Sequence, residues 1–410
     1  MARRIAIIGA GVSGLVCAHL LNRRHDITLF EAGGYIGGHT ATVRIRHEGQ
    51  DLDVDTGFIV FNRGNYPHFT KLIDSLAVKS KPTRMSFSVK CDRTGLEFGG
   101  GGFNAIFAQR RNLLRPAFLR MLRDIVRFGK DAPTQAAESN ETVGEFLARH
   151  AYSREFGEHY LVPMAAALWS ASEAMSRQIP IRFLVRFFEN HGMLSPRSAP
   201  TWEVIVGGSK RYVERILEGI DPVRIRLNTP VESIERTGSG VRVRSRQGLE
   251  DFDDVILGTH SDQALAMLKD PSQREREVLG AIGYQANDVA LHTDASVLPR
   301  SRRAWSAWNY HLTGAERATV TYHMGILQGL PVQSPVCVTL NGKVDPAKVL
   351  GKYTYHHPVF SLESDQARDR WSDISGVNRT HYCGAYWGNG FHEDGVLSAL
   401  SVCKAFGEAL

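Results

Sequence analysis

A glycine-rich turn near the start of the chain constrains its fold more than any other feature. Residues 9–14 read Gly-Ala-Gly-Val-Ser-Gly and directly follow the apolar run Arg-Ile-Ala-Ile-Ile at 4–8. Such a run is typical of a buried parallel strand, and the pattern at 15–22 predicts a helix after the turn. This combination is the fingerprint of a Rossmann unit, because the N–H groups at the helix N-terminus then face a pyrophosphate.

Each residue type in this unit has a physical role. Gly9 permits the tight turn, Gly11 lets the backbone approach the pyrophosphate, and Gly14 lets the helix pack closely on the strand. A second strand, predicted over 25–30, ends at Glu31, whose carboxylate can accept hydrogen bonds from a ribose diol. The sequence therefore predicts a dinucleotide site that includes Gly9, Gly11, Ser13, Gly14 and Glu31.

Length, composition and cysteine usage narrow the class of protein. A chain of 410 residues favours two domains, and 43% hydrophobic with 22% charged residues is typical of a soluble globular enzyme. No apolar run is long enough to span a bilayer, and the N-terminus is too short for a signal peptide, so we expect a cytoplasmic protein. Five scattered cysteines without a Cys-x-x-Cys pair favour neither a disulfide framework nor a zinc site.

Residues 31–39 extend the pattern beyond an ordinary Rossmann unit, since they read Glu-Ala-Gly-Gly-Tyr-Ile-Gly-Gly-His. An acid followed by a Gly-Gly pair and a basic residue resembles the second signature of the superfamily of flavin amine oxidases, carotenoid desaturases and protoporphyrinogen oxidases. This resemblance implies FAD as the cofactor, with Gly37, Gly38 and His39 along the flavin phosphates. Because the superfamily usually has arginine in place of His39, we expect a weaker or pH-dependent charge there.

Three further segments extend the resemblance over most of the chain. The segment 52–58 resembles the strand and turn beneath the flavin, which implies contacts from Asp55, Thr56 and Gly57. Val231 lies in a segment similar to the strand whose backbone receives the adenine. The segment 381–396 resembles the closing strand and turn before a helix that we expect from near Leu397, and it implies contacts from Gly384, Glu393, Asp394, Gly395 and Val396. Relatives have an acid just after the first glycine; Ala385 stands there, so we expect Glu393 or Asp394 to bind the ribityl chain.

The resemblance implies an α/β fold in which two domains are interleaved. A Rossmann-type, GR2-like FAD-binding domain would consist of residues 1–65, 203–262 and 372–410. The intervening stretches, 66–202 and 263–371, would form an α+β substrate domain.

The predicted substrate domain lacks a lysine and is rich in aromatic residues and histidines. Amine oxidases of the superfamily usually have a lysine near the flavin, but none occurs between Lys269 and Lys343, which argues against standard amine chemistry. The aromatic residues and histidines fit either an ordinary core or the lining of a pocket. The candidates for that lining and for proton transfer are Trp308, Tyr310, His311, His323 and His357. Neighbouring His356 and His357 would face opposite sides of a strand, so we expect no metal site.

A basic segment at 110–128 raises the question of a membrane partner. Its apolar residues repeat at helical spacing from Pro116, with arginines on the other face and before the helix. The segment fits either an ordinary surface helix or a helix that lies on an anionic membrane surface, which would make the protein peripheral on the inner face of the membrane. The net charge of +6 does not decide between these interpretations, and without interleaved exposed aromatic residues we expect no nucleic-acid binding.

Residues 55–62 and 306–311, Asp-Thr-Gly-Phe-Ile-Val-Phe-Asn and Ser-Ala-Trp-Asn-Tyr-His, resemble a bacterial branch of predicted NAD/FAD-binding proteins, of which one member is implied in furan fatty acid synthesis. This resemblance implies FAD-dependent desaturation of a methyl-branched unsaturated acyl chain of a phospholipid, with dioxygen as the electron acceptor. A flavin amine or amino-acid oxidase is an alternative, and so is a lipid-binding flavoprotein without catalysis.

Overall fold

The sheet that carries the glycine-rich turn is built from strands far apart in the sequence. The computed structural model describes residues 2–169, 172–194, 200–314 and 319–410. Five parallel strands lie in the order β10-β2-β1-β14-β20, with the bounds Ile225–Arg226, Asp26–Phe30, Arg4–Ile8, Asp254–Leu257 and Thr380–Tyr382. Strands β1 and β2 confirm the two strands predicted over 4–8 and 25–30. The predicted α/β class is confirmed as well.

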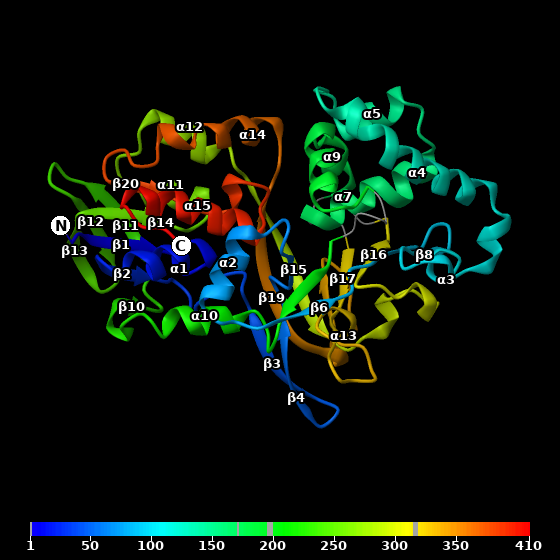
Figure 1. Ribbon diagram of the computed structural model, residues 1–410, viewed down its shortest axis with the longest axis horizontal. Helices are drawn as coiled ribbons and strands as arrows, with labels where there is room; N and C mark the ends of the chain where they lie inside the picture. Colours follow the sequence, from blue (N-terminus) through cyan, green and yellow to red (C-terminus); the bar gives the residue numbers. More distant parts are fainter. Residues whose placement is uncertain (1, 170–171, 195–199, 315–318) are drawn as a thin grey trace.

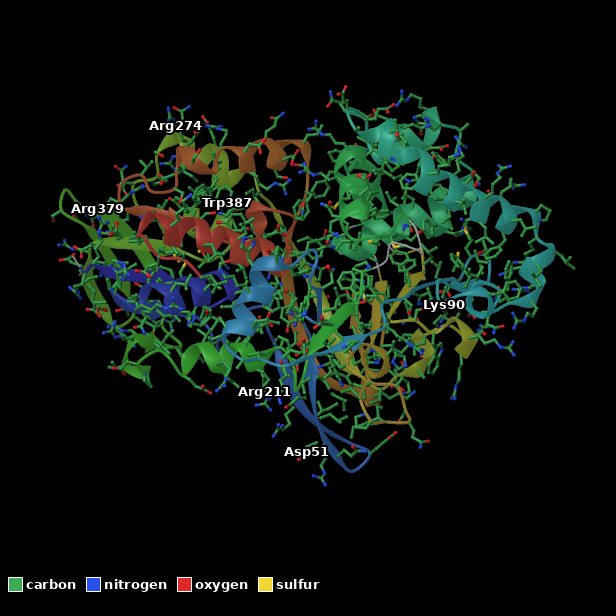
Figure 2. All side chains as sticks on the ribbon, viewed as in Figure 1. Asp51, Lys90, Arg211, Arg274, Arg379 and Trp387 are labelled. Atoms are coloured by element: carbon green, nitrogen blue, oxygen red, sulfur yellow. The ribbon has the colours of Figure 1, made fainter. Side chains whose placement is uncertain are left out.

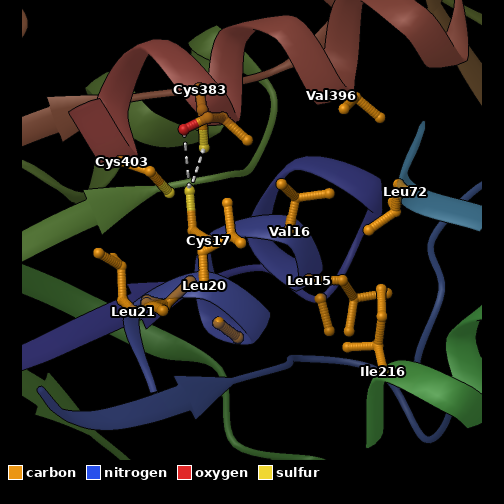
Figure 3. Close-up of a cluster of buried hydrophobic side chains, with 14 of the residues drawn as sticks. Leu15, Val16, Cys17, Leu20, Leu21, Leu72, Ile216, Cys383, Val396 and Cys403 are labelled. Carbon is orange, nitrogen blue, oxygen red and sulfur yellow. Dashed lines mark hydrogen bonds between the residues drawn. The ribbon is translucent and has the colours of Figure 1, made fainter. Parts of the chain in front are cut away.

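Alternate residues of the central strand β1 face two different cores. Ile5 and Ile7 pack under helices α1 (Val12–Leu21) and α15 (His392–Ala405), together with α2 (Pro67–Ser75) and α10 (Lys210–Leu217). Figure 3 shows this core, in which Cys17 lies 3.9 Å from Cys383, Sγ to Sγ, with Cys403 beside them. All five cysteines are buried free thiols.

The other core lies on the opposite face of the sheet. Ala6 and Ile8 pack there against an antiparallel sheet of β11 (Val231–Arg236), β12 (Val241–Ser245) and β13 (Gly248–Phe252). Three helices contribute residues to this core, namely α11 (Ser261–Met267), α12 (Gln273–Gly280) and α14 (Leu362–Asp369). The sheet is thus covered on both faces, as the continuous apolar run in β1 predicts.

A second, seven-stranded sheet lies beside the Rossmann unit (Figure 1). Its order is β19-β15-β18-β17-β16-β7-β8, and only β16 and β7 pair in parallel among the described strands. The bounds are Val349–Pro358, Tyr284–His292, Cys337–Leu340, Thr319–His323, Trp308–Leu312, Phe87–Cys91 and Leu96–Gly99. Apolar side chains from this sheet and from helix α13 (Met324–Leu327) form a further core.

A helical lobe covers one end of the seven-stranded sheet (Figure 1). It comprises α3 (Phe103–Ile106), α4 (Pro116–Ala136), α5 (Val143–Arg149), α6 (Arg154–Phe156), α7 (Val162–Trp169), α8 (Glu173–Gln178) and α9 (Ile181–Asn190). A short π-helical turn at Gly157–Leu161 joins α6 to α7. Phenylalanines dominate the core of the lobe, and several of their rings meet edge to face around Phe128. Within the described residues, none of these or other helices combines the length and hydrophobicity needed to cross a bilayer.

Two smaller sheets complete the architecture. The hairpin of β3 (Thr42–His47) and β4 (Gln50–Asp55) projects from the molecule, with Asp51 near its tip (Figure 2). Strands β5 (Val60–Asn62), β9 (Trp202–Ile205) and β6 (Ser80–Thr83) form an antiparallel sheet between the Rossmann unit and the seven-stranded sheet. Strand β9 pairs with β5, which precedes the predicted domain boundary after residue 65, and with β6, which follows it. This sheet therefore does not mark that boundary, and the domain boundaries stay a prediction.

Candidate active site

One cavity of about 1000 Å³ is lined by residues from both the Rossmann unit and the seven-stranded sheet. The glycine-rich turn, the end of β2 and the start of β11 line one part of it. Aromatic and aliphatic side chains from β7, β16, β17, β19 and the helical lobe line the other part. The nucleotide-binding residues predicted from the sequence and the predicted aromatic segment therefore border a common space.

The glycines of the turn have distinct steric environments. A Cβ on Gly14 would lie 1.9 Å from the carbonyl oxygen of Gly9, so only glycine lets α1 pack this closely on β1. A Cβ on Gly11 would meet no atom within 4 Å, because this position opens into the cavity. Gly11 is also the N-cap of α1, which has no side-chain cap and no acid in its first turn. The free N–H groups and the positive end of the helix dipole thus form an anion cradle.

Glu31 lines the cavity at the end of β2 and is already partly engaged. Its two carboxylate oxygens accept hydrogen bonds from the N–H groups of Ala10 and Gly33, each at 2.8 Å. A carboxylate offers about four acceptor positions, so both oxygens can still accept from a ribose diol. Val231, at the start of β11, lines the same part of the cavity.

His39 faces the cavity, and its buried Nε2 atom has no partner. Burial lowers the pKa of the His39 imidazole to about 3, and nearby His357 adds to this shift. The ring is therefore neutral at pH 7, which fits the expected weaker charge. It follows the pair Gly37 and Gly38, whose φ angles of +134° and +57° favour glycine.

The turn beneath the predicted flavin position divides its residues between the cavity and the core. Thr56 and Gly57 line the cavity, and the Thr56 hydroxyl lies 2.8 Å from the Tyr355 hydroxyl. Asp55 is buried and lies outside the described lining; its carboxylate accepts from Thr42, from the N–H and hydroxyl of Ser209, and from other groups. Burial raises the pKa of Asp55 to about 6.

The closing segment departs from the expected arrangement of its carboxylates. Helix α15 begins at His392, earlier than the start predicted near Leu397, because Asp394 accepts the Phe391 N–H at 2.9 Å and so caps the first turn. Glu393 caps α2 instead, since it accepts the N–H groups that begin that helix. Neither carboxylate is among the described residues that line the cavity.

Gly384, Gly395 and Val396 have different surroundings. Gly384 lines the cavity, whereas Val396 is buried in the core beside α1. The carbonyl of Gly395 accepts a hydrogen bond from the Ser13 hydroxyl at 2.9 Å, which ties the last helix to the glycine-rich turn. A Cβ on Gly395 would lie 2.6 Å from Val12, so this glycine allows the close approach of α15 and α1.

His392 is a cavity residue that the sequence did not single out. Its ring stacks on Phe58 with 3.6 Å between centroids, and its Nε2 lies 2.8 Å from the Tyr212 hydroxyl and 3.0 Å from Thr40 Oγ1. Burial lowers the pKa of the His392 imidazole to about 3. The only signal for His392 in the sequence is its place in a glycine-rich segment. Because the helix was predicted to start near Leu397, this histidine was expected to lie in a loop.

The five candidates from the substrate segments separate into two groups. Trp308 and His357 line the cavity. Tyr310, His311 and His323 are not among its described lining residues: Tyr310 is buried against α7, His311 Nε2 lies 2.8 Å from Asp92, and His323 accepts the N–H of Ile326. Strand alternation places Trp308 and Tyr310 on one face of β16, but α7 covers the second of them.

His357 is held by a hydrogen-bonded asparagine. The amide Nδ2 of Asn287 lies 3.3 Å from His357 Nδ1, while the Asn287 oxygen accepts from Asn341 at 2.8 Å. Nδ1 is therefore the acceptor, and the neutral ring carries its proton on Nε2. Burial, aided by His260 and His356, lowers the pKa of His357 to about 4.

The part of the cavity beyond His357 is apolar. Glu31 is the only carboxylate, and no Lys or Arg occurs, among the described residues that line the cavity as a whole. Its apolar walls include Met85, Phe87, Ile125, Met164, Leu168, Trp308, Tyr322 and Phe360. In the described parts of the chain, no group of three or more His, Cys, Asp or Glu side chains is arranged to hold a metal ion.

Fold and site together define a class: a protein with a Rossmann-type unit whose glycine-rich turn borders a cavity that extends into an apolar chamber. Residues 12–319, more than half of the chain, match the family described as flavin containing amine oxidoreductase, so the chain belongs to this family. Membership implies a flavin cofactor.

Individual relatives are distant. An L-amino-acid oxidase from Siganus canaliculatus is 26% identical over 312 residues, which are 71% of this chain and 57% of the length of that relative. The cyclohexylamine oxidase structure from Brevibacterium oxydans superimposes with a TM-score of 0.69 at 16% identity, over 99% of this chain and 100% of that one. A fatty acid isomerase from P. acnes that produces CLA gives a TM-score of 0.70 at 15% identity, over 98% of both chains.

Proposed function

We propose that this chain is an FAD-dependent oxidoreductase that dehydrogenates a neutral, apolar substrate, and that this substrate is a methyl-branched unsaturated acyl chain of a phospholipid. The composition of the cavity wall carries the proposal. An amine oxidase needs no fixed charge, but an amino-acid oxidase must bind a carboxylate, and the described lining offers no Lys or Arg for it. Apolar walls are suited to a hydrocarbon chain, which supplies no polar group to satisfy.

The residues present fit FAD. The uncapped N-terminus of α1 and the open space at Gly11 would hold the pyrophosphate, and Glu31 would hold a ribose. The buried, unpartnered Nε2 of His39 provides a further polar contact for the cofactor. When bound, FAD supplies the two-electron acceptor that takes a hydride from the substrate, and dioxygen would reoxidise it with release of hydrogen peroxide.

The chain itself would position the substrate and keep the site dry. Trp308, Tyr322 and Phe360 form walls that exclude water and hold the reacting carbon in place. His357 presents its Nε2–H as a donor for a substrate oxygen. The second hydrogen leaves as a proton, for which the neutral imidazole of His260 is the candidate acceptor in the lining, because burial lowers its pKa.

A second candidate is an amine or amino-acid oxidase, which the family description and the L-amino-acid oxidase relative favour. A fatty acid isomerase with the same fold supports the acyl-chain candidate, since that protein acts on a fatty acid. A lipid-binding flavoprotein without catalysis is the third candidate. The three differ in whether substrate reduces the flavin, and in which substrate does so.

The deciding experiment is anaerobic mixing of the FAD-loaded protein with one substrate class at a time, followed at the visible flavin band. We expect methyl-branched unsaturated phospholipid in mixed micelles to bleach the band, admission of air to restore it, and mass spectrometry to show loss of two hydrogens. Bleaching by primary alkylamines or neutral L-amino acids alone would replace the proposal with the second candidate. Tight lipid binding without bleaching would favour the third.

A further inference from the structure

One end of the helical lobe exposes large apolar side chains close together. Phe103 is 63% exposed, Leu113 is 41% exposed and Leu114 is 87% exposed. The Phe103 ring contacts Phe107 at 4.8 Å between centroids, and Phe107 contacts Phe118 of α4 at 5.8 Å, so α3 packs against the start of α4. Arg110 donates to the Asn104 side-chain oxygen, so the turn at 110–114 lies beside α3. This end lies farthest from the Rossmann unit (Figure 1). Apolar residues gathered in this way mark an interaction site, whereas single exposed ones do not.

The same surface carries positive charge that no carboxylate neutralises. The Arg110 guanidinium donates to the Phe107 carbonyl and to the Asn104 side-chain oxygen, and Arg111 donates to the Gly95 carbonyl. No carboxylate of the described residues lies within 4.0 Å of the guanidinium groups of Arg110, Arg111 or Arg115. Neutral acceptors leave the charge of an arginine intact, so these three residues attract anions.

The body of α4 differs from this end. Arg120 pairs with Glu155 at 2.8 Å, Arg127 lies near Asp124 and Asp131, and Met121 is fully buried. The helical part of the segment 110–128 also exposes Leu119 (44%) and Val126 (73%), but Arg120 and Arg127 of this part lie near carboxylates. Arginines without a carboxylate partner stand beside exposed leucines in the turn before the helix.

A second, smaller pocket of about 280 Å³ opens at the N-terminus of α4. The helix begins after Arg115 without a side-chain cap and without an acid in its first turn, and Ala117 and Phe118 of that turn line the pocket. His159, which is 7% exposed, also lines it, and its Nε2 has no partner. Two carboxylates of the lining are paired with arginines, Glu155 with Arg120 and Glu158 with Arg93 and Arg154, whereas Arg115 has no carboxylate partner among the described residues. A half-buried unpaired cation, free helix N–H groups and a free imidazole Nε2 together suit one phosphate group.

We propose that residues 103–115 dock the protein on an anionic phospholipid bilayer, with Leu113, Leu114 and Phe103 in the acyl boundary and the pocket at Arg115 around one lipid phosphate. An apolar edge flanked by arginines matches both layers of such an interface. Gly100 and Ile125, which lie on either side of the docking segment in the sequence, line the main cavity. Residues on either side of the docking segment thus also border the chamber that we propose to receive an acyl chain.

The first test is co-sedimentation of the full-length, FAD-loaded protein with vesicles. Vesicles of phosphatidylcholine alone are compared with vesicles that contain about one third phosphatidylglycerol. We expect binding to the anionic vesicles only, with weaker binding at high salt. Leu114→Asp should reduce the partition coefficient about tenfold or more because a leucine inserted into the bilayer is lost. Arg115→Gln should reduce the partition coefficient about fivefold because one charge contact with the anionic surface is lost.

Matched control variants carry the same changes elsewhere. Val223 is 76% exposed on the Rossmann unit, and Arg274 lies at the end opposite the docking segment (Figure 2). Val223→Asp and Arg274→Gln should bind vesicles as the unchanged protein does. Equal losses in the control and test variants, or no loss in either test variant, would overturn the proposal.

A second test reads insertion directly. Because all five native cysteines are buried, the variants Leu114→Cys and Val223→Cys can each be labelled at the new thiol with a polarity-sensitive fluorophore. We expect a blue shift on anionic vesicles for the label at 114 and none for the label at 223. A label at 114 that stays in water on bound vesicles would exclude insertion. Neither test requires turnover, so a failure here is distinct from a failure of the proposed dehydrogenation.

Discussion

Asn287 donates its amide hydrogen to Nδ1 of His357 over 3.3 Å and thereby fixes the proton of that neutral ring on Nε2. Asn287→Asp replaces this donor with a carboxylate, and an opposite charge beside an imidazole favours its protonated form. The pKa of His357 should therefore rise from about 4 by roughly one unit or more. We expect the acid limb of kcat/KM to move to higher pH by the same amount. Asn287→Leu, which adds no charge, should leave the acid limb in place. An acid limb at the same pH in both variants would contradict the assignment of that limb to His357.

His392 should make the stability of the protein depend on pH. Its pKa is about 3 in the folded protein and near 6.5 when unfolded, so its contribution is full above pH 6.5 and is lost as the pH falls toward 3. His392→Gln lacks this contribution at every pH. Urea unfolding at pH 6 and pH 5 should show the difference in unfolding free energy between the two proteins falling by about 1 kcal/mol. A difference that stays constant with pH would show that the histidine is not held neutral.

Comparing two glycines of the turn separates cofactor binding from folding. Gly11→Ala places a methyl group in open space, so the fold should keep its stability within about 1 kcal/mol. That methyl group would occupy the cradle and weaken FAD binding by about tenfold or more. Gly14→Ala forces a Cβ to 1.9 Å from the Gly9 carbonyl oxygen. It should therefore lower the free energy of unfolding by roughly several kcal/mol. Thermal unfolding and the flavin content after purification check both expectations, and equal flavin content in Gly11→Ala would contradict the first.

Two aromatic residues on one strand face test the substrate chamber. Trp308→Ala removes a wall of the cavity, and we expect kcat/KM for the acyl substrate to fall about tenfold or more because the reacting carbon loses its position. Tyr310→Phe, on the same face but covered by α7, should leave kcat/KM unchanged. Steady-state rates of oxygen consumption distinguish the two, provided that both variants retain FAD. A larger effect at Tyr310 would mean that the chamber extends beneath α7.

Local signals predicted the Rossmann unit well, because its strand, turn and helix follow one another directly in the sequence. The close backbone contacts that require glycine there are also made by residues nearby in the sequence. The role of Glu393 could not be predicted, since it depends on α2 beginning beside it although the two lie far apart in the sequence. Tyr310 shows the same limit: strand alternation fixes which face it occupies, but only the packing of α7 decides that this part of the face is core. His392 was missed because the start of its helix depends on a cap made by Asp394.

The hydrogen bond from Ser13 to Gly395 joins residues 382 positions apart. During synthesis, the glycine-rich turn leaves the ribosome well before the helix that packs on it. A nascent chain can therefore fold β1 and α1 early, but it lacks the wall formed by Gly384 and His392 until α15 has been made. Completion of the cofactor site thus depends on residues 384–395, and a chain cut short before them would have an open, unfinished site.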